Sequence, residues 1–158
     1  MKKNLPQIFF ARPTLTVARE LLGTYLVVRT SFAKGFGRPR SSMVAGMVVE
    51  TEAYIGEDDL ACHASRGRTA RTEGLYGPPG TAYIYLIYGM YYCFNVVTER
   101  EDFPSAVLIR AVEPTDGVVL MQKRRGTKDI HALASGPGKL CEALGINKSM
   151  HGVSMAGD

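Results

Sequence analysis

The stretch "TAYIYLIYGMYYCFNV", residues Thr81 to Val96, holds five of the eight tyrosines of a chain that has no tryptophan. Tyr83 and Tyr85 alternate with apolar residues, which predicts a strand with one aromatic face. Tyr88-Gly89 predicts a bend, so the stretch is typical of a β-hairpin. Two interpretations remain open at this point. The tyrosines form an aromatic core, or they offer a platform on which a flat group such as a nucleobase stacks.

The rest of the composition limits the class of protein. A chain of 158 residues with 46% hydrophobic content is long enough for one compact domain and too short for two ordinary ones. Its net charge of +4 gives a mild attraction for polyanions. The three cysteines never form a C-x-x-C pair, which argues against a disulfide framework and against a zinc knuckle. No signal peptide or membrane-spanning run is evident, so we expect an intracellular protein.

Several flanking segments have the patterns of regular elements. "RPTLTVARELLG", residues 12–23, predicts a short amphipathic helix that buries Leu15, Ala18, Leu21 and Leu22 and ends at Gly23. Strands are expected over 24–30, 43–54 and 105–114, and helices over 116–125 and 136–145. These elements predict a single α+β domain with a mixed, mostly antiparallel curved β-sheet and flanking helices.

The segments between these elements differ in character. Residues 31–42 are rich in Gly, Pro and Arg and predict an exposed basic loop. Residues 55–80 show no convincing periodicity, although "EDDLACHA" could make a helical turn, and a loop of that length is usually functional or disordered. Residues 146–158 show no clear element.

Acidic and basic side chains in two predicted strands suggest a site. In "VVETEAY" the residues Glu50, Glu52 and Tyr54 recur at period two and would share one strand face. In "VLIRAV" Arg110 interrupts an apolar run and needs a partner, for which Glu52 is a candidate. A guanidinium neighbour favours the ionised carboxylate, which could act as a general base. An ordinary ion pair is an equally good interpretation.

Three further residues are candidates for the site, and two of them allow more than one interpretation. His63 follows Cys62, but no second histidine or cysteine stands at ligand spacing, so a metal site is not expected, and His63 could instead close a pocket with Tyr54. Tyr88 at the predicted bend could cap the hairpin core or project and wedge between base pairs. Asn95, among aromatic and β-branched residues, needs hydrogen-bond partners if it is buried.

Four long motifs carry a resemblance to a known family. "VVETEAYIGEDDLACHASRGRTART", "GPPGTAYIYLIYGMYYCFNVV", "VLIRAVEP" and "SGPGKLCEALGINKS" resemble the alkyladenine (3-methyladenine) DNA glycosylase family, and the likeness begins near "FFARPTLTVARELLG". It implies base-excision repair by hydrolysis of the N-glycosidic bond of alkylated or deaminated purines that are flipped out of the duplex. No lysine lies in the motifs around Glu52 or Tyr85 to form a Schiff base, which favours a monofunctional enzyme that uses water.

The resemblance also implies roles for single residues. Glu52 matches the general base that activates the attacking water, and Arg110 matches the residue that helps to position it. Tyr54, His63 and Tyr85 match the walls of the pocket for the flipped base. Tyr88 matches the side chain that enters the vacated stack, and Asn95 matches the residue that disfavours normal guanine. The remaining candidates for DNA contacts are Arg66, Arg68, Arg71, Met90, Tyr91 and Lys139.

The expected partner is double-stranded DNA that contains damaged purines, bound by a monomer with no metal, no organic cofactor and no membrane attachment. The expected location is the cytoplasm, at the nucleoid. Relatives continue past "GINKS", so we expect residues 1–158 to be one glycosylase domain that lacks the C-terminal segment of the family. One alternative is a nucleic-acid-binding module without catalysis that uses the same aromatics and arginines. A carboxylate-pair glycosidase acting on sugars through Glu50 and Glu52 ranks third, because neighbours on one strand do not flank a scissile bond well.

Overall fold

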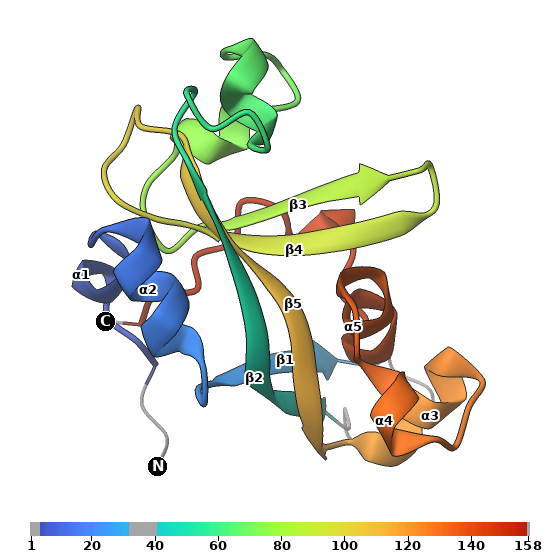
Figure 1. The fold of residues 1–158 in the computed structure, drawn as a ribbon. Helices are drawn as coiled ribbons and strands as arrows, with labels where there is room; N and C mark the ends of the chain where they lie inside the picture. The colour runs from blue at the N-terminus through green and yellow to red at the C-terminus, as the bar shows by residue number, and fades with distance from the viewer. Residues whose placement is uncertain (1–3, 32–40, 158) are drawn as a thin grey trace.

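The computed structural model describes residues 4–31 and 41–157. Its centre is a five-stranded sheet in the order β1-β2-β5-β4-β3, in which all four strand pairings are antiparallel (Figure 1). The strands are β1 (Tyr25–Ser31), β2 (Ser41–Ile55), β3 (Ala82–Ile87), β4 (Tyr91–Val97) and β5 (Ser105–Asp116). Together with the flanking helices this confirms the α+β prediction. Most of the predicted basic loop, residues 32–40, lies outside the described residues.

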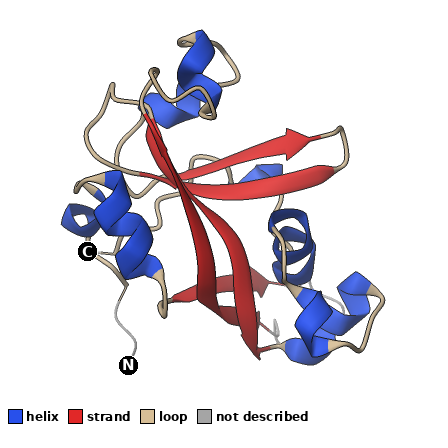
Figure 2. Ribbon diagram, in the orientation of Figure 1, coloured by secondary structure: helices blue, strands red, loops and turns tan. Residues whose placement is uncertain are grey.

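The helices lie around the edges and faces of this sheet (Figure 2). They are α1 (Gln7–Phe10), α2 (Thr14–Leu21), α3 (Val118–Arg125), α4 (Ile130–Leu133) and α5 (Pro137–Leu144). Helix α2 packs on β2 and β5, whereas α5 packs on β4 and β5 and is itself covered by α3. Within the described part of the chain, no helix combines the length and apolar character needed to span a membrane.

Helix α2 forms where the sequence predicts it but buries a different face. The buried residues are Thr14, Val17, Ala18 and Leu21, which follow the i, i+3, i+4, i+7 spacing of one helical stripe. Leu15 and Leu22 were predicted to be buried, yet they are 54% and 46% exposed. A buried threonine begins the stripe because its hydroxyl bonds the side chains of Thr98 and Glu99. These hydrogen bonds, which the sequence pattern does not reveal, therefore determine which face of α2 is buried.

The buried side chains form two groups on either side of β3. Ile84 belongs to the main core, which is shared by α2, α5 and the sheet. Tyr83 is buried in a smaller cluster with Tyr76 and Cys62, against which Tyr54 and Tyr85 pack. The alternation along β3 is thus confirmed, because neighbouring residues enter different cores. The aromatic cluster is where the candidate site lies.

The last residues of the chain run along the free edge of β3, where the sequence shows no clear element. A short 3₁₀ turn, η3 (Lys148–Met150), leads into an extended stretch. The Ala82 N–H donates to the Val153 carbonyl, and the Gly152 N–H donates to the Ala82 carbonyl, both at 2.8 Å. Backbone bonds from an irregular segment therefore cover an edge that would otherwise present unpaired groups.

Candidate functional site

The two carboxylates and the arginine predicted from the sequence meet on neighbouring strands. Arg110 on β5 donates from Nη1 to Glu52 Oε1 and from Nε to Glu50 Oε1, each at 3.0 Å. The predicted pairing of Arg110 with Glu52 is confirmed, and Glu50 is a second partner. None of the three is fully buried, and the Glu52 side chain is 37% exposed. Water can therefore reach the carboxylate that a hydrolytic mechanism would use.

Tyr54 ties this cluster to the aromatic pocket. Its hydroxyl donates a hydrogen bond to Glu52 Oε2, so the two oxygens of Glu52 are bound by different donors. Burial, then the hydrogen bond and charge of Glu52, raise the pKa of Tyr54 to about 12. The phenol therefore keeps its proton at neutral pH. Each carboxylate oxygen retains an unused lone pair that a water molecule could reach.

An open hollow with an empty volume of about 320 Å³ lies next to Tyr54. Part of this volume is open to solvent. All four residues predicted to contact the base line this hollow, together with several neighbours: Tyr54, His63, Tyr85 and Asn95, with Ala61, Cys62, Leu75, Tyr83 and Ala106. The structure therefore brings together residues from β2, the 56–81 loop, β3, β4 and β5.

His63 and Tyr85 form one wall of the hollow. Their ring centroids are 4.1 Å apart at an interplanar angle of 61°, so the rings touch edge to face and leave no space between them. His63 begins η1 (His63–Arg66), the 3₁₀ turn that forms near the helical turn expected in the loop. A planar ligand would have to stack between this wall and Tyr54, rather than between His63 and Tyr85.

A hydrogen-bonded chain fixes the protonation of His63. The Tyr83 hydroxyl donates to the Arg71 carbonyl at 3.1 Å and lies 3.3 Å from His63 Nδ1. Because a phenol has one proton and a carbonyl can only accept, Nδ1 of His63 must be the donor. Burial, and then the charge of Arg71, lower the pKa of His63. The imidazole is therefore neutral, with its proton on Nδ1.

Asn95 and Tyr83 form the floor of the hollow. Asn95 is 3% exposed, and its amide donates to the Tyr83 carbonyl at 3.2 Å, which meets the expectation that a buried asparagine has a partner. The sequence pattern indicates Tyr83 only as part of an aromatic strand face. Its links to His63, Arg71 and Asn95 make it a candidate site residue that sequence reasoning missed. The sequence feature that could have identified Tyr83 is its spacing of two residues from Tyr85, which places both side chains on one strand face.

The hairpin tip projects away from the sheet. Tyr88 and Gly89 both have positive φ, as in a type I′ turn, and Tyr88 is 85% exposed. Met90 and Tyr91 are also exposed. A Cβ on Gly138, in the first turn of α5, would lie 3.1 Å from the Tyr91 side chain, so the two elements approach each other closely here. Candidate DNA contacts from the tip and from the start of α5, including the exposed Lys139, are therefore neighbours.

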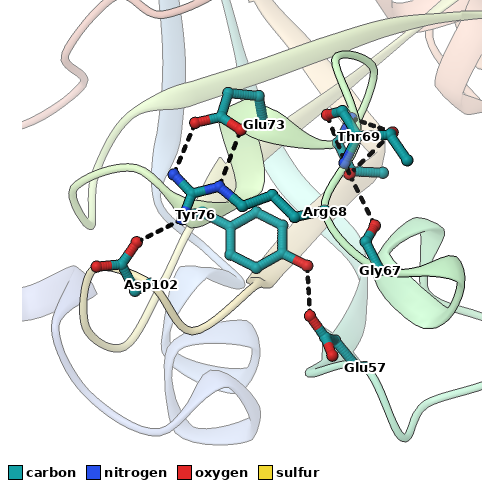
Figure 3. A network of polar contacts seen from close by, with 8 residues as sticks. Glu57, Gly67, Arg68, Thr69, Glu73, Tyr76 and Asp102 are labelled. Atoms are coloured by element: carbon teal, nitrogen blue, oxygen red, sulfur yellow. Dashed lines mark hydrogen bonds and ion pairs between the residues drawn. The ribbon is translucent and has the colours of Figure 1, made fainter.

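The arginine-rich loop is pinned by its own ion pairs (Figure 3). Arg68 binds Glu73 through Nε and Nη2 at 2.9 and 2.6 Å, and binds Asp102 at 2.7 Å. Its guanidinium also lies 4.7 Å from the centre of the Tyr76 ring. These partners compete with a phosphate, so the DNA contact predicted for Arg68 stays a prediction that this arrangement does not favour.

The other two arginines of the loop are less constrained. Arg66 is exposed, and Arg71 donates one bond of 3.3 Å to the Leu86 carbonyl on β3. Their contacts with DNA stay predictions.

Over residues 4–31 and 41–157, no group of three or more His, Cys, Asp or Glu side chains could hold a metal ion.

Comparison with known proteins gives a consistent result. The profile of the methylpurine-DNA glycosylase family matches residues 8–158. A protein of Methanocella arvoryzae is 51% identical over 152 residues, which are 96% of this chain and 72% of that protein. Proteins of Myxococcus xanthus and Chlorobaculum parvum are 52% and 47% identical over 92% and 99% of this chain. All three carry the name "Putative 3-methyladenine DNA glycosylase", and the chain spans 65% to 72% of their lengths.

Proposed function

Because the chain belongs to the methylpurine-DNA glycosylase family, we propose that it excises alkylated or deaminated purines from DNA by hydrolysing the N-glycosidic bond, the first step of base-excision repair. One observation carries the proposal. A water-accessible carboxylate, Glu52, is bound by Arg110 and is joined through Tyr54 to an aromatic hollow. A base in the hollow would thus bring its sugar close to Glu52.

Glu52 acts in this mechanism as the general base for the attacking water. Its negative charge also opposes the positive charge that develops on the sugar as the base leaves. Arg110 and Tyr54 hold the carboxylate by one oxygen each, so its orientation is set before substrate arrives. Arg110 also has donors left for the water, because its Nη2 has no partner within the described residues.

The hollow receives the flipped base. Extrusion from the duplex costs a few kcal/mol, and less when damage weakens pairing. Stacking on an aromatic side chain returns about 1–3 kcal/mol. These terms nearly cancel, so small differences in pairing decide which purines enter. Cationic N3- or N7-alkylated purines gain further from the electron-rich faces of Tyr54 and Tyr85 through cation–π attraction.

The hairpin tip supplies the wedge and the DNA contacts. Tyr88, which is more exposed than Met90 and Tyr91, fills the stack that the flipped base leaves. Asn95, on the pocket floor, opposes guanine by crowding its exocyclic amine. We expect the protein to act as a monomer on duplex DNA in the cytoplasm, at the nucleoid.

The alternative is a nucleic-acid-binding module without catalysis. The exposed tip residues Tyr88, Met90 and Tyr91 would serve such a module equally well. The ordered carboxylate beside the hollow has no function in it. The two candidates differ in what happens when Glu52 is changed.

The test is release of base from duplex oligonucleotides that carry hypoxanthine or ethenoadenine, measured under single-turnover conditions. We expect Glu52→Gln to abolish release while affinity for the damaged duplex is retained. A glutamine has one acceptor oxygen, so it cannot serve both Arg110 and Tyr54 as the carboxylate does. Glu113→Gln on β5 is the matched control, since Glu113 is exposed and has no side-chain partner within the described residues. Unchanged release by Glu52→Gln would remove Glu52 from the mechanism, and binding without release by the wild type would support the module.

A further inference from the structure

Glu50 is the one charged residue of the site that has no role so far. Its carboxylate accepts a hydrogen bond from Nε of Arg110, beside the bond that Nη1 gives to Glu52. We propose that Glu50 is a positioning residue that fixes the plane of the Arg110 guanidinium and thereby orients Glu52. The proposal deepens the glycosylase function and rests on it.

The strand geometry around Glu50 is irregular. The register of β2 against β5 shifts between Val48 and Glu50 and shifts again between Glu50 and Thr51. As a result, the ladder skips Val49 on β2 and Arg110 on β5. Irregularities of this kind re-aim side chains and are frequent beside active sites. Here the two register shifts flank Glu50 and leave Arg110 out of the ladder, and the side chains of Glu50 and Arg110 bind each other.

The guanidinium geometry explains what a second carboxylate adds. A guanidinium is planar, and its N–H groups point in fixed directions. A single acceptor at Nη1 leaves the plane of Arg110 free to rotate about that bond. A second acceptor at Nε, supplied by Glu50, removes this freedom. The N–H groups of Nη2 are then left in a defined direction for the attacking water.

Stability does not account for the arrangement. The Glu50 and Arg110 side chains are 54% and 42% exposed, and ion pairs with such exposure contribute little to folding. Two carboxylates on one strand face also repel each other unless a cation lies between them. Arg110 paired with Glu52 alone would leave no net charge, whereas Glu50 adds a negative charge that folding does not require. Glu50 is therefore explained by orientation rather than by stability.

The experiment compares Glu50→Ala, Glu50→Gln and the control Glu113→Ala in single-turnover base release and in binding to damaged duplex. We expect Glu50→Ala to lower the release rate constant about tenfold, which is about 1.4 kcal/mol, with dissociation constant and melting temperature unchanged. Glu50→Gln keeps an oxygen acceptor for Nε and should restore most of the rate. Glu113→Ala should behave as the wild type, because it removes one negative charge at a position that does not contact Arg110.

Two results with the single variants would overturn the proposal. One is a wild-type rate in Glu50→Ala, and the other is an equal loss in Glu50→Gln, which would point to charge rather than orientation. In an Arg110→Lys background the Glu50→Ala change should have no further effect, since lysine has no fork to orient. An undiminished effect there also contradicts the role.

A readout that does not depend on activity separates this inference from the proposed function. The Nε–H signal of Arg110 in nuclear magnetic resonance should exchange slowly in the wild type and rapidly in Glu50→Ala. Absence of base release by the wild type would refute the glycosylase function, and the exchange measurement would still decide the role of Glu50. Equal exchange rates in the two proteins would show that Glu50 does not hold Arg110.

Discussion

Removal of one hydroxyl group, by Tyr83→Phe, should disturb both the stability of the protein and its pocket. The hydroxyl donates to the Arg71 carbonyl at 3.1 Å and accepts from His63 Nδ1 at 3.3 Å, and the Tyr83 side chain is almost fully buried. Neutral hydrogen bonds contribute about 0.5–1.5 kcal/mol each, and these two are long. We therefore expect a loss of about 1–2 kcal/mol in the free energy of unfolding.

The expected change in melting temperature follows from this loss. For a chain of this size, 1 kcal/mol corresponds to about 2–4 °C, so Tyr83→Phe should melt about 2–8 °C lower. Thermal unfolding followed by circular dichroism measures it. Tyr92→Phe on β4 is the control, because Tyr92 is half-buried and its hydroxyl has no partner within the described residues. It should melt with the wild type.

The same substitution should slow base release. Without the phenol, His63 Nδ1 loses its acceptor, and the imidazole is free to change tautomer and to turn away from Tyr85. We expect the less well oriented pocket to raise the activation free energy of base release by about 0.7–1.4 kcal/mol. The rate constant then falls by a factor of about 3–10. Equal stability and equal release in Tyr83→Phe and Tyr92→Phe would refute the hydrogen-bonded chain through His63, Tyr83 and Arg71.

Two further predictions concern the hairpin tip and the pH dependence of folding. Tyr88→Ala should weaken binding to damaged duplex by about 1–3 kcal/mol, the contribution of one stacked aromatic side chain, and leave the melting temperature nearly unchanged. Fluorescence anisotropy measures the affinity, and an unaltered dissociation constant would contradict the wedge. Burial and the charge of Lys148 lower the pKa of His151 below 6.5, so the unfolded chain binds a proton that the folded one resists. Stability should therefore fall as pH drops below about 6.5, by at most about 1.4 kcal/mol per pH unit for each such group. His151→Gln should reduce that slope in denaturant titrations at pH 5 to 7, and an identical slope would exclude His151 as its source.

The sheet and the hairpin were predictable because their signals are local. Alternation at Tyr83 and Tyr85 shows in the sequence, and the same alternation separates the two cores in the structure. The rotation of α2 was not predictable, since it depends on bonds from Thr14 to Thr98 and Glu99, more than eighty residues away. Local periodicity gives the type of an element more reliably than it gives the face that becomes buried.

The site was predictable where a charged residue interrupts an apolar run of the sequence. An arginine inside an apolar run favours a carboxylate partner on a neighbouring strand, and Glu52 was the candidate for it. The second carboxylate, Glu50, was not assigned to Arg110, because the register shifts that bring them together leave no trace in the residue pattern. The pinning of Arg68 by Glu73 and Asp102 depends in the same way on how the loop folds back.

The C-terminal segment shows why a stretch without a sequence pattern can still support the site. The backbone groups of Ile84 are bound by two side chains from this segment, since the N–H donates to His151 Nδ1 and the carbonyl accepts from Lys148. The centre of the His151 ring also lies 5.7 Å from the centre of the Tyr83 ring. Gly74 packs closely on His151, since a Cβ at position 74 would lie 2.9 Å from the His151 ring. Ile84 separates the two pocket tyrosines of β3, so holding its peptide group holds both of them. The segment thus contacts the rear of the pocket by scattered single residues, which produce no periodicity.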